Sequence, residues 1–418
     1  MMADEELICI ARRLMDRRIR GVIITAFIAQ GLAIGSTLAV FSLFVRPVAE
    51  TFGASTLEVS VGISLITLSL AACGVPIGIW LDRGTPKFVM FTGCLVMTTA
   101  ILLASLAQSL AALALVCVLA GIGIPMLGPL TTAAVVGKVT REERGRALGF
   151  ANLGIPTFGI AFALSAGFAM EVWGWRPTLQ IFAGLIFLLG FPAIALGIPR
   201  NLNDSSNSQS TGSDSAEVWT PKRLLASRDF RLIALILGIG MGTTTGWVAH
   251  VAPFLADLGA STRYCGGVLG AMQGAMMVGT LVLGTMADRT SSVMILLGVF
   301  GVQVLCFVAL FSANGLGIAT AALLVAGIAT GGLLPVMSHL FAEEFGSDNV
   351  GRSMGLANVT ILPFGFGLPM LAGWLRDTTG SYSSTILVCL LLLVFGTAAV
   401  AALSLLRKGS TRVILPNQ

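Results

Sequence analysis

Apolar runs of about 18 to 25 residues without a charge alternate along this chain with short polar or charged segments. A run of that length crosses a hydrocarbon layer of roughly 30 Å as an α-helix. The pattern therefore predicts an all-α integral membrane protein with twelve transmembrane helices. The expected spans are residues 21–45, 57–81, 88–107, 109–137, 146–170, 177–198, 230–256, 263–287, 292–313, 315–342, 352–375 and 382–406.

The polar segments between these spans predict the domain organisation and the topology. All but four of the 25 Lys and Arg residues lie on one side of such an arrangement, and because positive loops stay inside, both termini are expected in the cytoplasm. A Ser-rich stretch between the sixth and seventh spans indicates a linker. The expected parts are a cytoplasmic tail (1–20), a six-helix bundle (21–198), a cytoplasmic linker (199–228), a second six-helix bundle (229–406) and a cytoplasmic tail (407–418).

An offset of 206 positions relates the two halves of the sequence. The charged turn with Gly78, Asp82 and Arg83 after the second span recurs as Gly284, Asp288 and Arg289 after the eighth span. The same offset also pairs Pro47 with Pro253, Gly121 with Gly327, Gly149 with Gly355, Asn152 with Asn358 and Gly167 with Gly373. A repeat of this length is too long for a solenoid unit, so we expect two pseudo-symmetric halves packed face to face.

Composition narrows the possible function classes. With 56% apolar and 11% charged residues, the chain cannot bury its hydrophobic surface in one soluble core and needs lipid around it. The formal net charge of +5 is explained by topology, because no basic cluster is interleaved with aromatic residues as nucleic-acid binding would require. The seven cysteines have no metal or disulfide spacing, and no nucleophile is paired with a base. We therefore expect no enzyme, no metal, no cofactor and no nucleic-acid partner.

The charged turn after the second span carries a family resemblance. Gly78, Asp82, Arg83 and Lys87 match the frame Gly-x-x-x-Asp-Arg-x-Gly-x-Lys/Arg, with Thr85 where glycine is usual. Together with the twelve spans in two halves, this resembles the major facilitator superfamily of secondary transporters. The resemblance implies alternating access around a site between the halves. We also expect a gating role for both loop copies, because their basic side chains can pair with acidic groups of the other half in one state and separate in another. The alternative is that these charges only anchor the loops on the cytoplasmic side, but the aspartate recurs in the second copy, where an anchor would not need it.

Within that superfamily the chain resembles the monocarboxylate and oxalate/formate porter branch. The matching segments are Phe41-Ser42-Leu43-Phe44, Pro47, Phe52-Gly53-Ala54-Ser55, Ser64-Leu65 and His250 to Leu255. The branch implies proton symport of a small organic anion across the cytoplasmic (inner) membrane, and we expect a monomer. Thr280 stands where carriers of this branch often hold an arginine. That departure favours the alternative, a carrier or exporter of a neutral or amphiphilic compound.

The resemblance places spans 1, 4, 7 and 10 around the cavity, with 2, 5, 8 and 11 completing it, so polar side chains deep in these spans are the substrate-binding candidates. They are Gln30 and Thr37 in span 1, Thr244, Trp247 and His250 in span 7, Gln273 and Thr280 in span 8, and Thr330 in span 10.

Several of these side chains have a second interpretation. His250 either exchanges a proton or binds a carboxylate, or it is an interfacial histidine satisfied by backbone carbonyls. Gln273 needs either a helix neighbour or a substrate oxygen as its partner. Asn152 and Asn358 are equivalent in the repeat, which favours a role in helix contact. Outside the candidates, His339 precedes Glu343 by one helical turn, and we expect the two to pair.

Overall fold

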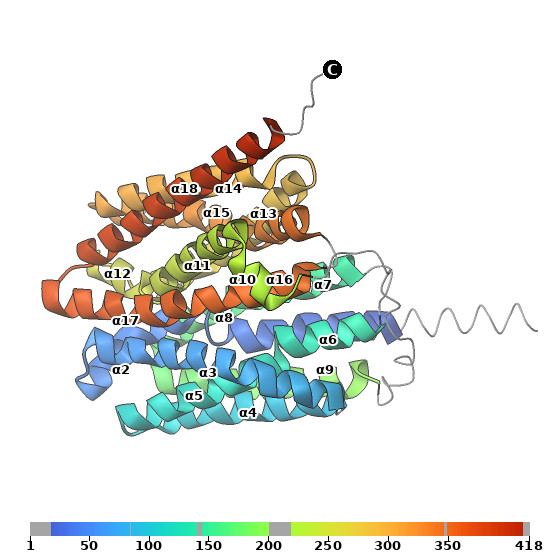
Figure 1. The fold of residues 1–418 in the computed structure, drawn as a ribbon. Coiled ribbons are helices and arrows are strands. Elements are labelled where there is room, and N and C mark those ends of the chain that lie inside the picture. The colour runs from blue at the N-terminus through green and yellow to red at the C-terminus, as the bar shows by residue number, and fades with distance from the viewer. Residues whose placement is uncertain (1–17, 84, 140–143, 200–218, 347–348, 413–418) are drawn as a thin grey trace, which may run out of the picture. The chain divides into compact units, whose positions relative to one another are not determined.

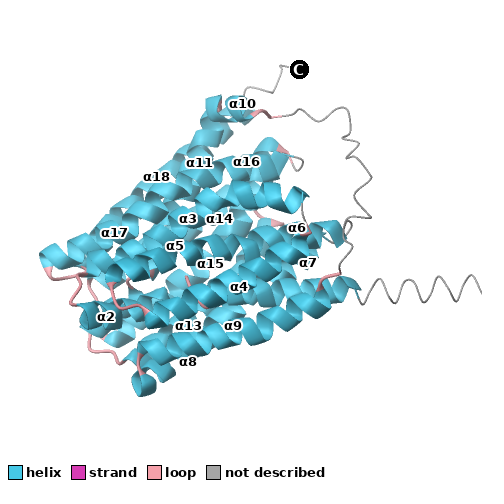
Figure 2. Ribbon diagram, turned by 90° about the horizontal axis from the view of Figure 1, so that it is seen from below, coloured by secondary structure: helices cyan, strands magenta, loops and turns pink. Residues whose placement is uncertain are grey.

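The computed structural model describes residues 18–83, 85–139, 144–199, 219–346 and 349–412, and helices account for nearly all of them (Figures 1 and 2). No strand occurs in these described ranges. The helices are η1 (Gly31–Gly35), α2 (Phe41–Phe52), α3 (Thr56–Arg83), α4 (Pro86–Leu106), α5 (Leu110–Leu127), α6 (Pro129–Val139), α7 (Arg144–Asn152), α8 (Gly154–Trp173), α9 (Trp175–Gly197), α10 (Pro221–Ala226), α11 (Arg228–Val248), α12 (Val251–Asp257), α13 (Thr262–Ala287), α14 (Ser292–Phe311), α15 (Leu316–Phe345), α16 (Val350–Ala357), η4 (Asn358–Thr360), α17 (Ile361–Thr379) and α18 (Ser383–Arg412). Most of the expected linker and of the N-terminal tail, and half of the C-terminal tail, lie outside the described residues.

Twelve helical segments in the described chain are long and apolar enough to cross a membrane, which confirms the expected number. Ten of them agree with the predicted spans to within four residues at each end. The first and seventh differ, because they end at Gly35 and Val248 instead of continuing to residues 45 and 256. Both of these predicted spans are therefore broken helices.

The first span breaks where local hydroxyl groups compete with the helix hydrogen bonds. The segment Gly31–Gly35 is a π-helix, and a turn separates it from α2, which begins at Phe41. The hydroxyls of Ser36 and Thr37 donate to the carbonyls of the residues four positions earlier, at 2.6 Å each. Such local bonds offer the backbone an alternative to a continuous α-helix. Short π segments are also frequent at functional sites.

The seventh span breaks at His250 because of the proline that follows. Pro253 has no backbone N–H, and its ring clashes with the carbonyl four residues earlier in a continuous helix. The N–H of His250 instead donates to the carbonyl of Trp247 at 2.8 Å, which tightens the last turn of α11. The chain then starts again as α12, so Trp247 and His250 lie at a fixed break and not inside a uniform helix.

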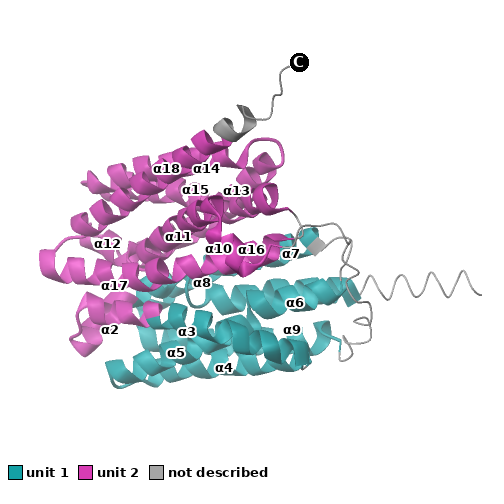
Figure 3. Ribbon diagram, viewed as in Figure 1, with its two compact units in different colours: residues 1–44, 65–211 teal, residues 45–64, 212–418 magenta. Residues whose placement is uncertain are grey.

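The chain divides into two compact units, one formed by residues 1–44 and 65–211 and the other by residues 45–64 and 212–418 (Figure 3). Residues 45–64 come from the N-terminal half of the predicted duplication but belong to the second unit. Within that unit, Asp377 accepts hydrogen bonds from the N–H groups of Thr56 and Leu57, and Ser64 donates to the carbonyl of Phe366. The bundle boundaries 21–198 and 229–406, which follow the sequence repeat, remain a prediction.

Glycines bring α13 and α15 of the second unit into backbone contact. A Cβ added at Gly279 of α13 would collide with the carbonyl oxygen of Ile328, and one at Gly331 of α15 would collide with that of Met276. Only glycine allows two helices to approach this closely. The contact fixes the distance between two of the four helices that enclose the candidate site.

Candidate functional site

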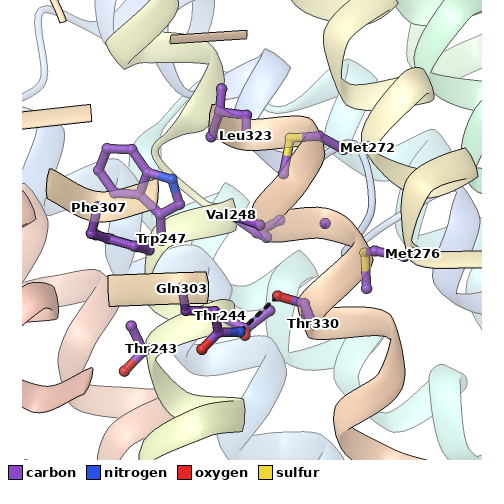
Figure 4. A pocket seen from close by; sticks show the side chains of 12 residues that line it. Thr243, Thr244, Trp247, Val248, Met272, Met276, Gln303, Phe307, Leu323 and Thr330 are labelled. Carbon is purple, nitrogen blue, oxygen red and sulfur yellow. Dashed lines mark hydrogen bonds between the residues drawn. The ribbon is translucent and has the colours of Figure 1, made fainter. Parts of the chain in front are cut away.

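A pocket in the second unit is enclosed by α11, α13, α14 and α15, and we call it the α11–α15 pocket (Figure 4). Three of the predicted binding residues, Thr244, Trp247 and Thr330, line it. The pocket encloses about 30 Å³. Since a water molecule needs roughly 10–15 Å³ by this kind of measure, the space suits about two waters or one small polar group of a ligand.

The indole N–H of Trp247 has no hydrogen-bond partner, although the side chain is only 4% exposed. In Figure 4 the nitrogen edge of the ring faces the middle of the pocket. The ring is held by Phe254 and Phe307, with centroid distances of 5.4 and 5.5 Å. The hydroxyl of Thr243, which also lines the pocket, likewise lacks a partner. A buried donor left unpaired costs about 1–3 kcal/mol, so these groups indicate a bound molecule.

An amide from α14 completes the polar side of the pocket. Gln303 is 4% exposed, and its Nε2 donates to Oγ1 of Thr330 at 3.1 Å, the dashed line in Figure 4. Gln303 is not among the predicted binding residues, because the resemblance places spans 1, 4, 7 and 10 and their neighbours around the cavity, and Gln303 lies in span 9. A signal was present all the same, since Gln303 is a single amide in the middle of an otherwise apolar run.

The remaining walls are apolar and contain no charged or ionisable group. Two methionines of α13, Met272 and Met276, lie opposite Phe307, and Leu323 and Val248 close the pocket. Flexible thioether side chains adapt to ligands of irregular shape. An isolated carboxylate in such a place would lose its hydration without gaining a counter-charge, at a cost of several kcal/mol. The pocket therefore suits uncharged groups.

The candidates of the first span lie in the first unit and are not among the residues that line this pocket. Gln30 precedes the π-helix and is 1% exposed, and its Oε1 has no hydrogen-bond partner. Thr37 uses its hydroxyl on the carbonyl of Ala33. Gln30 therefore remains a separate binding candidate, because its buried amide oxygen has no partner and a π-helix follows it directly.

The two candidates on α13 do not line the α11–α15 pocket either. Gln273 is half-buried and outside it. Oγ1 of Thr280 lies 2.9 Å from the carbonyl oxygen of Met276 and 2.8 Å from that of Gly331 on α15. The hydroxyl of Thr280 thus bonds to backbone at the close crossing of α13 and α15.

His250 lies in the break of the seventh span, between α11 and α12. Its Nε2 is 2.9 Å from the carbonyl oxygen of Pro369, and its Nδ1 is 3.3 Å from the hydroxyl of Tyr382. Because a carbonyl can only accept, Nε2 carries the proton and Nδ1 accepts from the tyrosine. These contacts favour the expected alternative of a histidine satisfied by a backbone carbonyl.

A second pocket in the same unit is lined by charged residues, and we call it the Tyr382 pocket. It encloses about 200 Å³. Arg376 makes two hydrogen bonds to the carboxylate of Asp257, at 3.0 and 3.2 Å, and lies over the ring of Tyr382. Arg46 pairs with Glu50 at 2.9 Å. Both arginines are therefore neutralised by acidic partners, and pairs this exposed contribute little to stability.

The first loop motif has a structural role within the first unit that its charge pattern alone does not predict. Lys87 donates to the carbonyls of Ala195 and Ile198, at 2.7 and 2.6 Å, and so caps the C-terminal end of α9. Asp82 and Arg83 are exposed, and Gly78 has open space around it. The proposed pairing of this motif with the other half remains a prediction.

The predicted pairing of His339 with Glu343, close to the second loop motif, is not found in the structure. Nε2 of His339 lies 3.3 Å from Oδ1 of Asp288, whereas Glu343 binds Ser292 and Arg407. The predicted pairing of His339 with Glu343 is wrong, because tertiary partners from α14 and α18 reach Glu343.

The other residues of the second motif are Gly284 and Arg289. A Cβ added at Gly284 would meet only the ring of Pro335, at ordinary contact distance, and Arg289 is exposed. Within the described residues there is no group of three or more His, Cys, Asp or Glu side chains that could hold a metal ion.

Comparisons with known proteins identify the family. A model of the Major Facilitator Superfamily matches residues 24–368. Monocarboxylate transporter 13 of Rattus norvegicus is 26% identical over 387 residues, which covers 91% of this chain and 88% of the relative. An uncharacterized MFS-type transporter, YcxA of Bacillus subtilis (strain 168), is 23% identical and is matched over 86% of its length.

A solved structure shares the fold. It is the crystal structure of a bacterial homologue of the human lysosomal transporter Spinster, in an inward-facing and occupied conformation. It superposes with a TM-score of 0.74 at 16% identity, covering 92% of this chain and 96% of that one. The expected twelve-span, all-α fold is thereby confirmed. The chain belongs to the Major Facilitator Superfamily and is a multi-pass membrane transporter of small molecules, not an enzyme.

Proposed function

We propose that this protein is a secondary active transporter that carries a small, monocarboxylate-like organic acid by alternating access, together with protons. It works as a monomer in a bacterial-type cytoplasmic membrane, with both termini in the cytoplasm. The observation that carries this proposal is the similarity to monocarboxylate transporters along almost the whole chain, with 26% identity over 91% of it in one case. Coupling to an ion gradient agrees with the lack of any nucleotide-binding loop in the sequence.

A second candidate is a carrier of neutral or amphiphilic small molecules. Two observations favour it. Thr280 replaces the arginine common in the carboxylate carriers, and its hydroxyl bonds to backbone carbonyls. The lining of the α11–α15 pocket also contains no cation. The carboxylate of an acid bound there would have to accept hydrogen bonds from neutral donors, or it would have to lie outside this pocket.

Transport assays in proteoliposomes test the proposal. Labelled acids of two to five carbons, and the amide of each as a neutral analogue, are added outside vesicles with an alkaline interior, with protein-free vesicles as the control. We expect protein-dependent accumulation of at least one acid, abolished by a protonophore. Accumulation of the amide alone would favour the second candidate, and no protein-dependent uptake of any acid would refute the first.

A further inference from the structure

Three of the polar groups that line the α11–α15 pocket differ from their counterparts when the two halves of the sequence are compared. At the offset of 206 positions, Trp247, Gln303 and Thr330 correspond to Phe41, Met97 and Ile124. All three counterparts are apolar, and Met97 and Ile124 are completely buried in the first unit. Apolar side chains therefore suffice for packing at these positions of the repeat. The hydrogen-bonding groups in the second half need another explanation.

Trp247 and Gln303 can also still form hydrogen bonds with a ligand. The indole N–H of Trp247 is unpaired and faces the pocket. The bond between Gln303 and Thr330 uses one N–H of the amide, which leaves its second N–H and its Oε1 for another group. Aromatic neighbours and the bond to Thr330 fix the orientation of these side chains. Fixed donors of this kind bind a ligand oxygen without a further cost in ordering.

The chemistry of the walls limits what can bind. A carboxylate would be buried at a cost of several kcal/mol because no cation lines the pocket, whereas a hydroxyl, a carbonyl or an amide oxygen can accept from the indole without that cost. The volume of about 30 Å³ admits one such group, and the methionines and Phe307 accept the adjoining carbon atoms. Bound water fits the same space when no ligand is present.

We propose that the α11–α15 pocket binds an uncharged oxygen-bearing group of the transported molecule and selects substituted acids over plain alkanoic acids. This inference rests on the proposed function, because it assigns a second recognition group to the same substrate. Trp247 donates to the ligand oxygen, and Gln303 with Thr330 forms the opposite side. The acid's own charge is not held in this pocket.

The test is competition against uptake of a labelled acid in proteoliposomes. Plain acids of three to five carbons are compared with the same acids carrying one hydroxyl or oxo group at each position in turn. We expect at least one substituted acid to compete ten-fold or more better than its parent. Trp247→Phe keeps the ring and removes the donor, and Gln303→Met keeps the volume and removes the amide. Each variant should lower that ratio at least five-fold.

Thr245→Val is the matched control, because Thr245 lies on the same helix outside the pocket and bonds to the carbonyl of Met241. It should keep the wild-type ratio. Equal competition by parent and substituted acids, or an unchanged ratio in folded Trp247→Phe and Gln303→Met, would overturn the inference, leave the proposed function standing and assign the pocket to water. If one variant fails to fold, the other decides. No uptake of any acid would refute the proposed function and this inference with it.

Discussion

Replacing Asp377 by alanine is predicted to loosen the start of α3 in the second unit. The two carboxylate oxygens of Asp377 accept from the N–H groups of Thr56 and Leu57, at 3.0 and 2.7 Å. The next N–H, that of Glu58, is capped by the hydroxyl of Ser55. The first N–H groups of a helix have no partner within the helix, so Asp377 supplies what the local sequence cannot.

The size of the effect follows from these contacts. Loss of a side-chain cap costs typically about 1 kcal/mol, and loss of a negative charge at a helix N-terminus about 0.3–1 kcal/mol more. Because Asp377 is exposed, water replaces part of each bond. We therefore expect a loss of about 1–2 kcal/mol, which is a factor of about 5–30 in the opening equilibrium of this segment. Asp377→Asn keeps one acceptor oxygen and should give an intermediate value.

Hydrogen exchange followed by mass spectrometry measures this directly on protein in detergent or nanodiscs. Peptides covering residues 55–64 should exchange about 5–30 times faster in Asp377→Ala than in the wild type. Thr378→Val is the control, because that hydroxyl bonds only within its own helix, to carbonyls such as that of Trp374. Exchange within a factor of two of the wild type in Asp377→Ala would refute the capping argument.

Two further predictions concern other parts of the molecule. Gly279→Ala places a Cβ against the carbonyl of Ile328 and should lower the free energy of unfolding. Gly267→Ala lies on the same helix but has open space around the new Cβ, so the free energy of unfolding measured by denaturation should stay the same or rise by up to about 1 kcal/mol. Lys87→Met should lower the free energy of unfolding by about 1 kcal/mol and speed amide hydrogen exchange at the C-terminal end of α9. Unchanged hydrogen exchange there would show that Lys87 does not stabilise this helix end.

Sequence reasoning predicted the fold because the signals for it are local and repeated. Long uncharged runs define the spans, and the offset of 206 positions defines the duplication. The helix breaks were missed because hydrophobicity does not change across them. Pro47 and Pro253 are equivalent in the repeat, yet one span breaks well before its proline and the other three residues before it. Hydroxyl-to-carbonyl bonds decide the first break, and they depend on rotamers that a hydrophobic pattern does not contain.

The candidate site could be predicted only in part, for a similar reason. Trp247 and Thr330 stood out as polar groups in spans expected to line a cavity, and the structure brings them together. Gln273 and Thr280 stood out equally, but the rotation of α13 places other residues of that helix in the pocket. Gln303 was passed over because its span was expected to be peripheral. Tertiary packing determines which face of a helix contacts its neighbours, and the polar positions along the sequence do not determine that packing.

The break between α11 and α12 explains how the two pockets of the second unit are connected. Tyr382 lines the charged pocket and lies 6.4 Å from the ring of Trp247, which lines the uncharged one. His250, inside the break, accepts from the hydroxyl of Tyr382 while donating to the carbonyl of Pro369, so this wall is tied to α17 as well. Arg376 lies over the ring of Tyr382, and Tyr382 contacts Trp247 both directly and through Phe254, whose ring lies 6.2 Å from that of Tyr382 and 5.4 Å from that of Trp247. The charged pocket and the uncharged pocket therefore share a continuous aromatic wall, although no charged residue lines the uncharged one.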